Sequence, residues 1–126
     1  MNIAWVFLGG GIGASLRYLM GVAFSQTQVS LFGKNLPWAT LACNLIGCLL
    51  LGVITALLLK SPNLESPLRP LLATGVMGGF TTFSTFSLEI VKYQQAGDLT
   101  TGLLYALGSI VLGVILCAIG YGLASQ

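Results

Sequence analysis

A run of glycines, hydroxyls and phenylalanines between Thr74 and Ser87 contains the residue types of this chain that could do chemistry. It reads Thr-Gly-Val-Met-Gly-Gly-Phe-Thr-Thr-Phe-Ser-Thr-Phe-Ser inside a long apolar segment. A lipid-facing helix does not tolerate such a break, because unpaired backbone N–H and C=O groups are costly in hydrocarbon. We therefore expect this run to face protein or a water-filled path and to form an ion or substrate site.

The phenylalanines of this run favour a small anion as the ligand. Phe80, Phe83 and Phe86 recur every three residues along one side of the chain, interleaved with hydroxyls. That spacing is also typical of core packing, but the interleaved hydroxyls make an ordinary core a poorer interpretation. A ring edge carries partial positive charge, and it attracts an anion weakly enough to let it leave. A site of ring edges, hydroxyls and one amide has no fixed negative charge, which argues against a cation or proton pathway.

The composition predicts an all-α integral membrane protein. Hydrophobic residues make up 56% of the 126 positions and charged residues 6%, against about 25% charged residues in soluble domains. Four apolar blocks reach the roughly 20 residues that a span requires: residues 3–24, 37–59, 68–93 and 101–124. The connecting segments are too short to fold alone, so we expect one four-span domain over residues 1–126. We expect the first block to be a permanent span rather than a cleaved signal, since no basic segment precedes it.

The third span is predicted to be broken near its middle. Its first half-helix, Leu68–Met77, opens with Arg69-Pro70, where a proline is well tolerated. Gly78-Gly79 and then Thr81-Thr82 disturb the helix, and a second half-helix continues to about Tyr93.

Arg17 is a cation inside the first span. A cation costs at least about 2.5–3.5 kcal/mol at the centre of the bilayer, and less near the interface. One interpretation is that Arg17 draws an anion into an aqueous vestibule. The other is a snorkelling anchor.

Spans two and four each carry a polar stripe. Thr40 and Asn44 are four residues apart, as are Tyr105, Ser109 and Gly113. The Asn44 amide could bridge two helices, or it could aim its N–H₂ group at an anion or at the broken segment. The second stripe, with a phenol, a hydroxyl and a gap, would line a polar path.

The chain has almost no side chains suited to catalysis. There is no histidine, and the three acids are Glu65, Glu89 and Asp98, so acid–base or metal chemistry is not expected and the chain is predicted not to be an enzyme. We expect Glu89, near the end of span three, to have a structural role with hydroxyls or a cation as its partner. The three cysteines lack metal-ligand spacing and are interpreted as packing residues.

The basic residues leave membrane orientation undecided. Lys60 and Arg69 flank the spans on one side, and Lys34 and Lys92 on the other. Because the more basic side stays cytoplasmic, an even split predicts that copies insert both ways up and pair as an antiparallel dimer. The alternative is a single orientation decided by Arg17.

The motifs together resemble the Fluc (CrcB-type) fluoride channel family. They are Gly9 through Tyr18 in span one, Asn44-Leu45-Ile46-Gly47 in span two, and Thr74-Gly75 with Gly79 through Phe86 in span three. The resemblance implies a dual-topology homodimer with two antiparallel pores in the bacterial cytoplasmic (inner) membrane. It implies passive export of fluoride, contact with membrane lipid, no nucleic acid, and a structural Na⁺ on the dimer axis.

The resemblance also implies roles for individual residues. Phe80 and Phe83 match the pore phenylalanines, and Asn44 matches the pore amide. The remaining pore positions are hydroxyls: Thr40, Thr82, Ser84 and Ser87, with Tyr105 and Ser109 as the polar track. Gly113 stands where some relatives carry another hydroxyl.

The expected Na⁺ ligands are the backbone carbonyls of Gly75 and Gly78, which lack side chains that could cover them. In an antiparallel dimer the two breaks would meet, presenting four oxygens suited to a hard cation.

Two other classes of protein fit part of these observations. A small dual-topology proton-coupled multidrug transporter matches the size and charge balance, but it requires a carboxylate at the centre of the membrane. A holin-like packing protein explains the glycines and leaves the phenylalanine and hydroxyl pattern unexplained.

Overall fold

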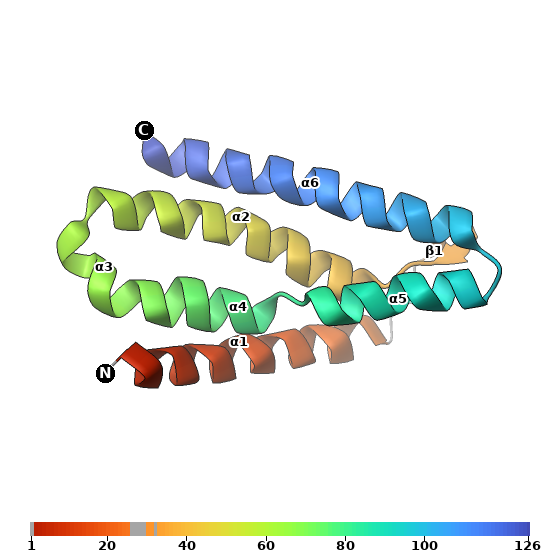
Figure 1. Ribbon diagram of the computed structural model, residues 1–126, viewed down its shortest axis with the longest axis horizontal. Coiled ribbons are helices and arrows are strands. Elements are labelled where there is room, and N and C mark those ends of the chain that lie inside the picture. Colours follow the sequence, from red (N-terminus) through yellow and green to blue (C-terminus); the bar gives the residue numbers. More distant parts are fainter. Residues whose placement is uncertain (1, 26–29, 32) are drawn as a thin grey trace.

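Four long helical segments run side by side in the computed structural model of the protein, which describes residues 2–25, 30–31 and 33–126 (Figure 1). They are α1 (Asn2–Ser25), α2 (Trp38–Lys60), the composite segment of residues 69–95, and α6 (Leu99–Ser125). Each is long and apolar enough to cross a membrane. The prediction of an all-helical protein with four spans is confirmed.

The third span is broken where two threonines leave the helical conformation. It consists of a π-helix, η1 (Arg69–Met77), a short helix, α4 (Gly78–Phe80), and α5 (Phe83–Gln95). Thr81 and Thr82 between them are extended, with ψ of 159° and 121°. Figure 1 shows this non-helical link between α4 and α5. The expectation that Gly78-Gly79 begins the break is wrong, because both glycines lie in the helix α4.

Ordered elements also occupy two of the connections. A short helix, α3 (Pro62–Leu68), follows α2, and strands β1 (Ser30–Leu31) and β2 (Lys34–Asn35) pair antiparallel between α1 and α2. The hairpin is fastened to the turn between α5 and α6. Lys34 Nζ lies 2.6 Å from Asp98 Oδ2, and Tyr93 donates its hydroxyl hydrogen bond to the Asn35 carbonyl at 2.8 Å. The hydrogen bond from Lys34 holds the pKa of Asp98 below its usual value.

The helices pack chiefly as two pairs, α1 with η1 and α4, and α2 with α6. Glycines permit backbone contact within both pairs: a Cβ at Gly13 would meet the Val76 carbonyl, and one at Gly120 would meet the Leu49 carbonyl. Close approach through small residues is the usual way that membrane helices associate. Both termini and α3 lie at one end of the molecule, and the hairpin and the α5–α6 turn lie at the other (Figure 1).

Candidate functional site

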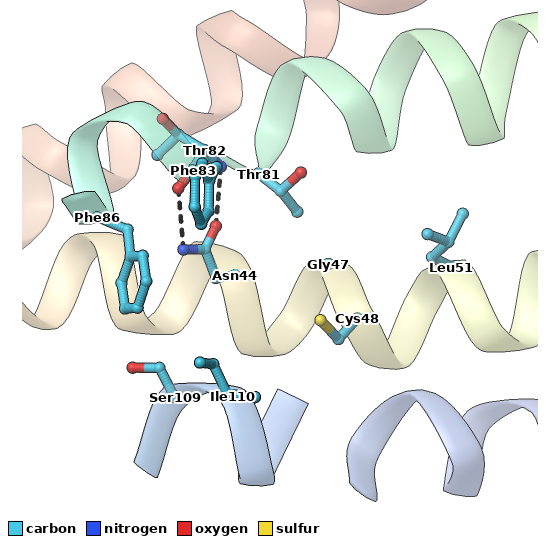
Figure 2. Close-up of a pocket in the computed structure, with 10 residues that line it drawn as sticks. All are labelled: Asn44, Gly47, Cys48, Leu51, Thr81, Thr82, Phe83, Phe86, Ser109 and Ile110. Atoms are coloured by element: carbon cyan, nitrogen blue, oxygen red, sulfur yellow. Dashed lines mark hydrogen bonds between the residues drawn. The ribbon is translucent and has the colours of Figure 1, made fainter. Parts of the chain in front are cut away.

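A cavity of about 280 Å³ lies where the break in the third span meets α2 and α6. The residues that matter for its chemistry are Asn44, Thr81, Thr82, Phe83, Phe86 and Ser109. Figure 2 shows their arrangement, with the Asn44 amide directed at Thr82 and both phenylalanines on the segment that leads out of the break. The cavity therefore combines one amide, aromatic rings and hydroxyls, as the sequence predicts.

The Asn44 side chain replaces the helical hydrogen bonds that Thr82 lacks. The Thr82 N–H donates to Asn44 Oδ1 at 2.8 Å, and Asn44 Nδ2 donates to the Thr82 carbonyl at 3.1 Å. Both alternatives left open by the sequence meet in this geometry. A carboxamide carries two N–H donors, so one N–H of Asn44 holds the break and the second is left for another acceptor.

Other side chains satisfy further backbone groups at the break. Thr82 Oγ1 accepts from the Thr85 N–H at 3.3 Å and so caps the start of α5. Arg17 Nε donates to the Gly79 carbonyl at 3.0 Å, close to the end of α4. The Arg17 guanidinium, for which the sequence left a vestibule role and a snorkelling anchor open, thus has a backbone partner. Cations at helix C-termini are favourable for the same electrostatic reason.

Two glycines let the neighbouring helices reach the break. A Cβ on Gly79 would strike the Gly10 carbonyl of α1, and a Cβ on Gly47 of α2 would strike the Thr81 side chain. The motifs Gly9 through Tyr18 and Asn44 through Gly47 therefore converge on the break from two sides.

The rings beside the cavity are those of Phe83 and Phe86, with centroids 6.0 Å apart and planes tilted by 40°. Phe83 is 79% exposed and Phe86 is 7% exposed. Phe80, which the resemblance placed in the pore, is 7% exposed and does not line this cavity. The break falls after Phe80, which leaves that ring on the other half-helix. The three-residue spacing from Phe83 to Phe86 was the signal that could have identified Phe86.

The carboxylate of Glu89 has a hydroxyl partner on each oxygen. Thr40 Oγ1 donates to Oε1 at 2.6 Å, and the Tyr105 hydroxyl donates to Oε2 at 2.7 Å. The expectation that hydroxyls pair with Glu89 is confirmed. Thr40 and Tyr105, predicted as pore hydroxyls, are thus joined through this acid, and the Tyr105 ring lies 5.3 Å from that of Phe86. No local pattern in the sequence links Thr40, Glu89 and Tyr105 as one cluster.

The predicted serines differ in what they could offer an anion. Ser87 donates to the Phe83 carbonyl at 2.9 Å and Ser109 to the Tyr105 carbonyl at 2.6 Å. A hydroxyl has one proton, so these two serines have already used theirs. Ser84 is exposed and pairs with Thr82 Oγ1 at 3.3 Å.

Side chains offer no metal centre in the part of the chain that the structure describes, where no group of three His, Cys, Asp or Glu residues comes together. Cys43, Cys48 and Cys117 are free thiols, and Cys43 is 1% exposed, as expected of a packing residue. A cation bound at the break would have to use backbone oxygens.

Comparison with known proteins identifies the family. Residues 4–121 match the family described as CrcB-like protein, Camphor Resistance (CrcB). The chain belongs to this family. A relative from Agrobacterium fabrum, named a fluoride-specific ion channel, is 43% identical over 98% of this chain and 94% of its own length. Relatives with the same name from Prosthecochloris aestuarii and Magnetococcus marinus are 45% and 40% identical, over 92% and 95% of this chain and 87% and 94% of their own lengths.

Membership of the CrcB family settles two predictions. The four spans and these relatives make the chain a multi-pass bacterial membrane protein. Its relatives are named as ion channels, so the prediction that it is not an enzyme is confirmed. None of the relatives named here is a multidrug transporter, and the only acid in the cluster described above is held by two hydroxyls.

We predict that Asn44→Ala lowers the free energy of unfolding by about 1–3 kcal/mol, because it leaves two part-buried backbone groups of Thr82 without partners. Asn44→Asp should be intermediate, since it keeps an acceptor for the Thr82 N–H and loses the donor. Chemical unfolding of the purified protein in detergent measures both changes. Gln94→Ala, at an exposed amide of α5, is the matched control. An Asn44→Ala protein as stable as this control would contradict the assignment.

Proposed function

We propose that the protein is a passive fluoride channel of the bacterial cytoplasmic membrane. The observation that carries the proposal is the cavity at the break, where the free N–H of Asn44 lies beside the rings of Phe83 and Phe86. No carboxylate is among the described residues that line it. The names of the relatives provide independent support.

The chemistry of this cavity suits a small anion in transit. Ring edges carry partial positive charge, and the N-terminus of α5, which begins at Phe83, adds the partial positive end of a helix dipole. These attractions are weak enough for exit, whereas a buried lysine at the same place would hold the anion. The described residues that line this cavity include no acid that could exchange protons for substrate, which supports passive conduction.

We predict that Phe83→Ile and Phe86→Ile each slow fluoride efflux from liposomes by about tenfold, which corresponds to about 1.4 kcal/mol of lost stabilisation. Isoleucine keeps the apolar bulk and removes the ring edge. A fluoride electrode measures efflux from vesicles that contain the purified protein.

Two matched variants sharpen this test. Phe7 lies on the exposed face of α1, so the Phe7→Ile channel should conduct normally. The Phe80→Ile channel compares the ring predicted from the resemblance with the two rings of the cavity. Wild-type vesicles that release no fluoride would refute the proposed function. Normal efflux in both cavity variants would remove the rings from the mechanism.

The proposed channel is an antiparallel homodimer with two pores. Support comes from the ring of Phe83, which is 79% exposed beside the cavity in a single chain and needs a neighbour to enclose it. The even distribution of lysine and arginine between the two ends, Lys60 and Arg69 against Lys34 and Lys92, permits both orientations.

We predict that charge added to either end fixes orientation and silences the channel. Ser61→Lys with Asn63→Lys loads the α3 end, and Gln94→Lys with Gln95→Lys loads the opposite end. Each double variant expressed alone should lose fluoride efflux, and co-expression of the two should restore it, because antiparallel partners are again present. If either double variant inserts in one orientation and still conducts alone, the antiparallel arrangement is wrong.

The backbone at the break fits the Na⁺ that the family resemblance implies. The Thr82 N–H, which would donate to the Gly78 carbonyl in an unbroken helix, donates to Asn44 instead. The Thr85 N–H, which would donate to the Thr81 carbonyl, donates to Thr82 Oγ1. Gly78 and Thr81 therefore carry two of the carbonyls that lose their helical donors at the break, and the Gly75 carbonyl, the other predicted ligand, accepts from the Gly78 N–H. Such oxygens suit a hard cation.

We predict that a bound Na⁺ would lie against these carbonyls on the dimer axis, where its charge would join the two copies and attract a passing anion. Crystal structures in Na⁺ and in Na⁺-free buffer test this proposal. An axis without density in Na⁺, or one that holds a water surrounded by hydrogen-bond donors, would rule the site out.

A further inference from the structure

A second cavity, of about 430 Å³, lies at the hairpin end of the molecule. Its polar lining comes from Glu89, Lys92 and Tyr93 of α5 and from Asn35 of the hairpin. The Tyr93 hydroxyl and the Asn35 carbonyl are bonded to each other at 2.8 Å. The ionisable groups that face this space are thus one acid and one lysine, beside a phenol already bonded to the backbone.

Among the described residues, Lys92 has no side-chain hydrogen bond or ion pair, in contrast to Arg17 and Lys34. Arg17 is bonded to the Gly79 carbonyl, and Lys34 is paired with Asp98. Lys60 and Arg69 belong to the opposite end of the bundle. The exposed Lys92 thus lines the cavity without a bonded partner among the described residues.

Glu89 connects this cavity to the site at the break. It lines the 430 Å³ cavity and also a neighbouring one of about 220 Å³ between α1, α2 and α5. Its carboxylate binds the Tyr105 hydroxyl, whose ring contacts Phe86 of the inner cavity. An ion that moves from the hairpin end toward the break therefore passes the Glu89 carboxylate.

A carboxylate on that route repels an anion, so the approach needs a compensating charge. Lys92 lies one helical turn from Glu89 on the same helix and lines the same cavity. Unlike Lys34, it does not form an ion pair with Asp98. A charge at the mouth of a narrow path raises the local concentration of ions of opposite sign.

We propose that this cavity is the outer anion site of the pore and that Lys92 is its anion-attracting group. The inference rests on the proposed function. The site takes a small hydrated anion, since a space of this size holds several waters. Lys92 acts before the anion reaches the inner cavity at the break, where the anion still has its hydration shell. It also offsets the charge of Glu89.

The test compares fluoride efflux of Lys92→Gln and wild type at about 0.01 M and about 1 M of an impermeant background salt, where the screening lengths are about 30 Å and 3 Å. Na⁺ is held constant throughout. We expect Lys92→Gln to slow efflux about threefold at low salt and to match wild type at high salt. Lys92→Arg should restore the low-salt rate. The matched control is the double variant Lys34→Gln with Asp98→Asn, which removes a neutral pair at the same end and should leave the salt dependence unchanged.

The outcomes separate this inference from the proposed function. Wild-type efflux establishes whether the protein conducts fluoride, independently of Lys92. Given a conducting wild type, equal rates for Lys92→Gln and wild type at low salt would overturn the proposal, as would the same fractional loss at both salt concentrations. Size-exclusion chromatography monitors assembly, and Lys92→Met, which keeps the aliphatic stem, replaces the glutamine variant if that variant fails to assemble.

Discussion

The structure depends on the need to pair every backbone group of a broken helix inside a membrane. Thr81 and Thr82 interrupt the third span, and lipid offers no partner for the N–H and C=O groups that this interruption frees. Asn44 meets the requirement with two hydrogen bonds to Thr82, and Arg17 binds the Gly79 carbonyl. The glycine-rich faces of α1 and α2 follow from the same need, because a larger side chain at Gly47 or Gly79 would keep these helices away from the break.

The same hydrogen bonds decide which groups are left to bind an ion. Asn44 donates one N–H to the Thr82 carbonyl, which leaves its second N–H for another acceptor. Ser87 and Ser109 donate their single hydroxyl protons to backbone carbonyls of their own helices. The carbonyls of Gly78 and Thr81 lose their helical donors to side chains at the break. The break thus brings together the second N–H of Asn44, which could bind an anion, and the carbonyl oxygens of Gly78 and Thr81, which could bind a cation. The proposed conduction therefore depends on the integrity of the break.

Charged residues are few in this protein, and several of those that the structure describes have polar partners. Thr40 and Tyr105 hold the Glu89 carboxylate, and Lys34 and Asp98 hold each other across the connections. Such pairing is expected where a free charge is expensive. Lys92, which faces a polar cavity at the membrane end, therefore changes the local field more than the same residue would on a highly charged soluble protein.

The sequence by itself determined the membrane class, the four spans and the importance of the third span. The length of an apolar segment and the presence of polar residues within it are local properties that can be read from the sequence. The sequence could not decide where the break begins, since Gly78 and Gly79 are compatible with helix or with a break. The extended conformation is stabilised by the hydrogen bond between Asn44 of α2 and Thr82, which is a tertiary contact. The position of the break then moves Phe80 out of the cavity and brings Phe86 into it. The joining of Glu89 to hydroxyls on α2 and α6 was likewise fixed only by helix packing, because hydrogen bonds between distant segments depend on positions that no local pattern specifies.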